Sequence, residues 1–211
     1  MSLRGTALGV GKGGARAAGG GHGAECRAPQ APSTKEVWIA RHAKPLIELG
    51  ICYGALDVAA DVALTQAAAS ALAQALPEGV VVRVSPLKRC VQLAESLQVL
   101  RPELVFTLDE RLREMDFGSW EGVPWADIPK EAVDAWTADF AHHRFGGKES
   151  ANEVLARVGS AWDDVQGTST LWIAHSGVAQ SAVLLQQGTR RIEHAKDWPV
   201  SSLKYGAWVA F

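Results

Sequence analysis

The sequence lacks the features that would place it in several specialised classes of protein. Its three cysteines are scattered at Cys26, Cys52 and Cys90, and no C-x-x-C pair occurs, which disfavours zinc ribbons and thioredoxin-like motifs. No apolar run approaches the ~18 residues that a membrane span needs. The formal charge of −2 points to neither a nucleic acid nor a membrane surface as partner. A sparse, odd set of cysteines is typical of a reducing compartment, so we predict a cytoplasmic protein.

Large apolar residues are also nearly absent from residues 1–35, which are rich in Gly, Ala and Arg. Such a segment cannot bury enough surface to offset its ordering entropy, so we predict a disordered or non-native N-terminal extension. Its GVGKG stretch is no phosphate-binding loop, because Thr6 replaces the first glycine and no Ser or Thr follows Lys12. A basic targeting peptide is the alternative. Residues 36–211 are predicted to form a single domain.

Strand and helix patterns alternate along that domain. Helix starts are predicted at Thr65 as N-cap, at Ser85 with Pro86 in the first turn, and at a capping box from Ser150 to Glu153. This alternation predicts an α/β domain with a three-layer α/β/α sandwich. The predicted strands are 37–40, 80–84, 104–108, 170–174 and 203–211, and the predicted helices are 65–76, 85–100, 150–165 and 177–187.

Two of the predicted strands end at a histidine. The apolar run 37–40 leads into Arg41 and His42, and the run 171–174 leads into His175, followed by a small turn. In open α/β sheets, ligands bind beyond the carboxyl ends of the strands. A guanidinium and two imidazoles at that edge indicate an anionic substrate.

Arg89 and Glu114 lie in other segments that lead to the same edge, and together the five residues suit phosphoryl transfer. The two arginines, Arg41 and Arg89, can bind phosphate oxygens with planar forks of donors. We assign His42 as the nucleophile at phosphorus and His175 as a donor to the phosphoryl oxygens. Glu114 would protonate the leaving alkoxide and then activate water. These cationic and polar groups already neutralise the developing charge, so neither a metal nor a cofactor is predicted.

Four segments resemble the motifs of the histidine phosphatase (phosphoglycerate mutase-like) superfamily, in the right order over about residues 36–211. The resemblance implies that His42 is phosphorylated, that Arg41, Arg89 and His175 bind the phosphate, and that Glu114 donates the proton. It also implies a mixed, mostly parallel sheet flanked by helices. The four segments are RHAKP at 41–45, SPLKRCVQ at 85–92, LREMDFGSWEG at 112–122 and AHSGV at 174–178.

The residues after the first histidine resemble one branch of this superfamily. The RHAKP start, the CYG segment at 52–54 and Asp57 are similar to the α-ribazole-5′-phosphate phosphatases of cobalamin nucleotide-loop assembly. That substrate carries an aromatic base, on which Trp120, Trp125 or Tyr53 could stack. For Trp120 we prefer the interpretation that it packs under its own loop. The predicted substrate-binding residues are Arg41, Arg89, His175, Ser176, Tyr53 and Lys44.

Other functions stay open beside this one. A phosphoglycerate mutase or a broad-specificity sugar-phosphate phosphatase would use the same residues, but residues 123–148 are the one insert able to form a lid, which favours hydrolysis. A non-catalytic phospho-ligand binding module is disfavoured because all five core residues are present. The predicted partner is a small-molecule phosphate ester, with neither nucleic acid nor membrane, and a homodimer stays open.

Overall fold

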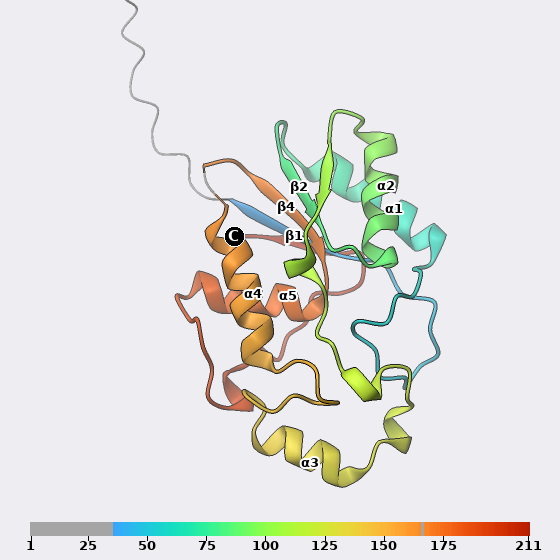
Figure 1. Cartoon of the computed structure of the whole chain (residues 1–211). Helices are drawn as coiled ribbons and strands as arrows, with labels where there is room; N and C mark the ends of the chain where they lie inside the picture. Colours follow the sequence, from blue (N-terminus) through green and yellow to red (C-terminus); the bar gives the residue numbers. More distant parts are fainter. Residues whose placement is uncertain (1–35, 166) are drawn as a thin grey trace, which may run out of the picture. The chain divides into compact units, whose positions relative to one another are not determined.

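A five-stranded mixed sheet is the centre of the computed structural model, which describes residues 36–165 and 167–211. The prediction for residues 1–35 lies outside the described residues. Strands β3 (Phe106–Leu108), β2 (Val81–Val84), β4 (Thr170–Ala174) and β1 (Val37–Arg41) lie parallel in that order, and β5 (Trp208–Ala210) pairs antiparallel with β1 (Figure 1). The predicted mixed, mostly parallel sheet is therefore confirmed.

Both outer strands are shorter than the sequence predicts. β3 begins only at Phe106, and β5 covers three residues of the predicted 203–211 strand. The segment before β5 leaves the ladder because the backbone N–H of Gly206 donates to the carbonyls of Arg41 and His42, each at 3.1 Å. The predicted beginning of this strand, residues 203–207, was therefore wrong, and Leu203 and Tyr205 contact Arg41 instead.

Helices α1 (Val62–Ala75) and α2 (Lys88–Leu100) cover one face of the sheet (Figure 1). The predicted cap of α1 at Thr65 is wrong, because the Asp61 carboxylate accepts the N–H of Leu64 at 2.8 Å and starts the helix one turn earlier. The Thr65 hydroxyl donates back to the Asp61 carbonyl. The buried members of this layer include Ala69, Leu72, Leu93, Leu97, Leu171 and Ile173.

The start predicted for α2 is also wrong. The helix begins at Lys88 after Leu87, whose side chain makes no capping bond. The Asp57 carboxylate, from a distant loop, accepts the N–H of Lys88 at 2.7 Å and so replaces a local cap. The Ser85 hydroxyl accepts only a long bond of 3.5 Å from the N–H of Leu87, and its close partner is His175 at 2.8 Å.

Helices α4 (Ala151–Asp163) and α5 (Ser176–Gln186) cover the opposite face, which completes the predicted three layers (Figure 1). The capping box of Ser150 and Glu153 is present as predicted. Neighbouring residues of β1 point to opposite faces, as a strand requires: Ile39 packs on the α4 and α5 side, and Ala40 on the α1 and α2 side. The sheet is thus buried on both sides, and its ligand-binding edge is fixed by two cores.

Helix α3 (Lys130–Ala138) lies away from the sheet, next to a small third core around Cys52, Ile128 and Phe145 (Figure 1). Across the described ranges 36–165 and 167–211, no helix is long and apolar enough to span a bilayer. Four 3-10 helices complete the described secondary structure: Glu110–Leu112, Gly118–Trp120, Trp125–Asp127 and Ala195–Asp197.

Candidate active site

A cavity of about 370 Å³ lies beyond the carboxyl ends of β1 and β4. His42 follows β1 directly, and His175 follows β4, which pairs with β1 so that Arg41 lies opposite Ala174. Adjacent parallel strands therefore deliver the two histidines to one point. The cavity is lined by Arg41, His42, Tyr53, Arg89, Glu114, Met115, Phe117, Trp136, Phe140, Ser176, Gly177, Gln180 and Trp198.

His42 is held as a neutral imidazole with a defined tautomer. Its Nδ1 lies 2.7 Å from the Ala43 carbonyl, which can only accept, so Nδ1 carries the proton. Its Nε2 accepts a hydrogen bond from Nε of Arg89 at 3.2 Å. Burial, with a smaller effect of the nearby Arg89 guanidinium, lowers the pKa of His42 from 6.5 to about 3. The lone pair of Nε2 is therefore available to attack an electrophile at neutral pH.

Arg89 is fully buried, and each part of its guanidinium has a partner. Besides the bond to His42, Nη1 donates to the Leu56 carbonyl at 2.8 Å and Nη2 to the Gly54 carbonyl at 2.6 Å. Two backbone carbonyls thus fix the plane of the guanidinium against the histidine. An arginine held this way presents a rigid fork, which suits phosphate oxygens.

The loop that carries those carbonyls is fixed by Glu121. Its carboxylate accepts the backbone N–H groups of Gly54, Ala55 and Leu56 at 2.9–3.0 Å, and that of Phe117 at 2.9 Å. Glu121 therefore acts on His42 through the loop and Arg89. The sequence analysis missed this role, although Glu121 belongs to the LREMDFGSWEG segment.

Arg41, the last residue of β1, also lines the cavity. Its Nη1 donates to the Leu203 carbonyl at 2.6 Å, and its guanidinium carbon lies 4.0 Å from the ring centroid of Tyr205. The Nε of Arg41 is buried and has no partner among the described residues. The Tyr205 hydroxyl is 2.8 Å from that of Tyr53, and burial raises the pKa of Tyr53. Arg41 thus retains an unused donor in a residue that lines the same cavity as His42.

His175 is completely buried behind His42, with 5.1 Å between the ring centroids. Its Nε2 lies 2.8 Å from the Ser85 hydroxyl and 3.4 Å from the Cys90 thiol. Burial, and then Arg89, hold the pKa of His175 well below its usual value. Burial likewise raises the pKa of the Cys90 thiol to about 12. One neutral imidazole and two guanidiniums therefore line the cavity, and the second neutral imidazole lies behind the first.

The Glu114 carboxylate lies at the start of α5. Both of its oxygens are 3.2 Å from the N–H of Gly177, and one also accepts the N–H of Met115 at 3.1 Å. A Cβ on Gly177 would lie 2.4 Å from Oε1 of Glu114. Glycine at position 177 is therefore required for this placement of the carboxylate.

The cavity wall away from the arginines is aromatic. The ring centroids of Trp136 and Phe140 are 5.4 Å apart, and those of Phe140 and Trp198 are 6.0 Å apart. Trp120 and Trp125, named from the sequence as stacking partners, do not line the cavity; Trp120 packs on Phe145 with 5.9 Å between centroids. Trp120 thus packs within the protein, the interpretation that we favoured for it from the sequence, and Trp125 lies outside the lining of the cavity.

The structure brings most of the predicted site residues together. Arg41, His42, Arg89, Glu114, Tyr53 and Ser176 line one cavity, and His175 lies directly behind it. Lys44, predicted to bind substrate, is exposed and does not line the cavity. Cys52 is buried, and burial raises the pKa of its thiol to about 12, so the thiol stays protonated. The described part of the chain contains no cluster of three His, Cys, Asp or Glu side chains placed to hold a metal ion.

Comparisons with known proteins agree with this arrangement. Residues 37–204 match the family model of the histidine phosphatase superfamily (branch 1). The chain is 31% identical over 163 residues to the Hydrogenobacter thermophilus protein named "Putative phosphoserine phosphatase 2", covering 73% of this chain and 79% of that protein. It superposes on a mycobacterial glucosyl-3-phosphoglycerate phosphatase with a TM-score of 0.68 and 24% identity, covering 83% and 89% of the two chains. A Thermus thermophilus protein, TTHB049, gives a TM-score of 0.63 and 26% identity, with 83% and 92% covered.

Proposed function

Because this chain belongs to the histidine phosphatase superfamily, it hydrolyses phosphoric monoesters, and we propose that it does so through a phosphohistidine on His42. The observation that carries the proposal is the neutral, Nδ1-protonated imidazole whose Nε2 accepts a hydrogen bond from Arg89 in a cavity that Arg41 also lines. A lone pair at this position is the requirement for nucleophilic attack at phosphorus.

In the first step, Nε2 of His42 attacks phosphorus and the bond to the leaving oxygen breaks. Glu114 acts as the general acid and gives a proton to that oxygen, so the product leaves as an alcohol. Arg41, Arg89 and His175 bind the three phosphoryl oxygens as negative charge develops on them. The Nε–H of Arg89 that donates to Nε2 in the free enzyme becomes available to a phosphoryl oxygen when the lone pair is used.

In the second step, the Glu114 carboxylate takes a proton from water, and the water oxygen attacks phosphorus. The P–N bond breaks, inorganic phosphate leaves, and His42 regains its lone pair. A single residue can serve both steps because the proton that it donates in the first is replaced in the second.

We further propose that the substrate is a phosphate ester with an aromatic group, such as α-ribazole 5′-phosphate in cobalamin nucleotide-loop assembly. Among the described residues that line the cavity, the charged ones are Arg41, Arg89 and Glu114, all assigned to the phosphoryl group or the proton. No charge is left there for the carboxylate and ammonium of phosphoserine. The wall of Trp136, Phe140 and Trp198 supports an aromatic leaving group instead.

Two experiments test these proposals separately. An alkaline quench after mixing with ³²P-labelled substrate should trap one acid-labile, base-stable label on His42, and His42→Ala should give none; label elsewhere or no label would refute the covalent route. A substrate panel compares kcat/KM for α-ribazole phosphate, L-phosphoserine, glucosyl-3-phosphoglycerate, 3-phosphoglycerate and fructose phosphates. Preference for phosphoserine or a sugar phosphate would refute the substrate proposal alone. Formation of 2-phosphoglycerate from 3-phosphoglycerate would support the mutase alternative.

The proposed cellular location rests on the amino-acid composition. Three cysteines without a recurring spacing support a reducing compartment, so the cytoplasm is the proposed location.

A further inference from the structure

We propose that Arg157 and Glu149, which do not line the cavity, are a positioning pair that sets where Glu114 exchanges its proton. This inference rests on the role proposed for Glu114 as acid and base. It concerns the backbone that carries Glu114, and the pair itself touches neither the substrate nor the phosphoryl group.

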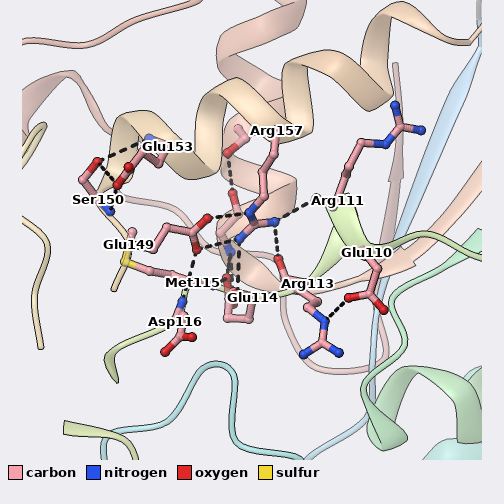
Figure 2. Close-up of polar contacts among 12 residues, drawn as sticks. Glu110, Arg111, Arg113, Glu114, Met115, Asp116, Glu149, Ser150, Glu153 and Arg157 are labelled. Carbon is pink, nitrogen blue, oxygen red and sulfur yellow. Dashed lines mark hydrogen bonds and ion pairs between the residues drawn. The ribbon is translucent and has the colours of Figure 1, made fainter. Parts of the chain in front are cut away.

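Arg157 projects from α4 onto the backbone of the Glu114 loop (Figure 2). Its Nη1 donates to the carbonyls of Arg111 at 2.8 Å and Arg113 at 2.6 Å, and its Nη2 donates to the carbonyl of Glu114 at 3.2 Å. One rigid guanidinium therefore holds three carbonyls from four consecutive residues.

Glu149 holds the same loop on the other side of Glu114. Its carboxylate accepts the N–H of Asp116 at 3.2 Å and binds Nε and Nη2 of Arg157 at 2.6 and 2.9 Å (Figure 2). The two side chains are only 20% and 16% exposed, so this bidentate pair is little screened by solvent. Backbone contacts on both sides of Glu114 leave its Cα little freedom to move.

The placement matters because proton transfer depends steeply on distance. A displacement of about 1 Å at a reacting group can cost up to about a hundredfold in rate. The donors of Arg157 are taken up by carbonyls and by Glu149, so its role is to fix geometry. A purely structural role would predict a different result, namely an equal loss on every substrate.

The test compares esters that need the proton with one that does not. Glu149→Gln keeps the size of the side chain but removes its charge, and Arg157→Lys loses the fork of donors. For each, kcat/KM is measured on p-nitrophenyl phosphate, whose leaving group is a weak base, and on an alkyl phosphate. The matched control is Arg144→Lys. Arg144 forms an ion pair with Glu153, which lies on α4 as Arg157 does, but Arg144 does not contact the Glu114 loop.

For both variants we expect kcat/KM to fall about tenfold or more on the alkyl ester and less than about twofold on the aryl ester. The control should show no such difference between the esters. In a Glu114→Gln background, Glu149→Gln should add no further selectivity between the esters. An equal loss on both esters, or full additivity with Glu114→Gln, would overturn the positioning role.

If Glu114→Gln itself lost activity equally on both esters, the proposed acid would be wrong, and that result is distinct from failure of the positioning pair alone. The urea midpoint of each variant reports folding separately. If Arg157→Lys does not fold, Glu149→Gln decides the question by the same ratio of kcat/KM values.

Discussion

Burial of a neutral His42 should make the protein lose stability as the pH falls. The imidazole binds a proton with a pKa of 6.5 in the unfolded chain, but of about 3 in the folded protein. Between these values the unfolded state binds more protons, so acid favours unfolding. The contribution of His42 is fully present above pH 6.5 and is lost as the pH falls toward 3.

The magnitude follows from the shift. Each pH unit in this window costs about 1.4 kcal/mol, so lowering the pH from 7 to 5 should remove about 2 kcal/mol through His42 alone. Lowering it to pH 3 should remove about 4 kcal/mol, because the folded protein also begins to bind the proton there. His175 adds to the loss in the same direction, because its pKa is also well below the usual value.

The assay is urea unfolding of wild-type protein and His42→Gln at pH 7 and pH 5. Glutamine does not titrate, so the variant should lose about 2 kcal/mol less than wild type between the two pH values. His143→Gln, outside the core, is the control and should follow wild type. If His42→Gln lost as much free energy of unfolding as wild type, His42 would not be buried in its neutral form, and its role as a ready nucleophile would fail with it.

Three further predictions concern the cavity. Gly177→Ala should displace the Glu114 carboxylate and lower kcat/KM for an alkyl phosphate about tenfold or more with little change in the urea midpoint, because the new Cβ meets the movable end of a side chain; unchanged activity would contradict the geometry. Trp198→Leu should raise the KM of an aromatic ribotide about fivefold and leave that of a simple alkyl phosphate unchanged; equal effects would argue against stacking. Activity should survive dialysis against a chelator, since the groups around His42 provide the positive charge; loss that Mg²⁺ or Zn²⁺ restores would refute this.

The parts of the site that could be predicted from the sequence are those that depend on short, local patterns of residues. His42 and His175 follow apolar runs that become adjacent strands, so parallel pairing was enough to bring them together. The capping box of α4 was also predictable, because both of its members lie within one turn. Local patterns of this kind need no knowledge of the tertiary structure.

The residues whose roles were not predicted share a different physical cause. Asp57 caps α2 from 31 positions away, which freed Ser85 from the predicted capping role and left it for His175. Tyr205, Glu121 and the aromatic wall act through contacts between distant segments that no local pattern encodes. In a single sequence, such residues look like ordinary surface charges or core aromatics.

The pairing of β1 with both β4 and β5 has a kinetic consequence. Trp38 lies opposite Leu171 on one side and Ala210 on the other, so the strand that leads into His42 pairs, within the described residues, only with segments far along the chain. Contacts between residues so far apart in sequence form late in folding, because the entropy cost of closing the long loop precedes the free energy gained from strand pairing. Helices and helix pairs can assemble earlier, but they do not bring His42 and His175 together, because these residues follow strands β1 and β4. Recovery of phosphatase activity during refolding should therefore lag behind recovery of helical circular dichroism, and would report the completed sheet.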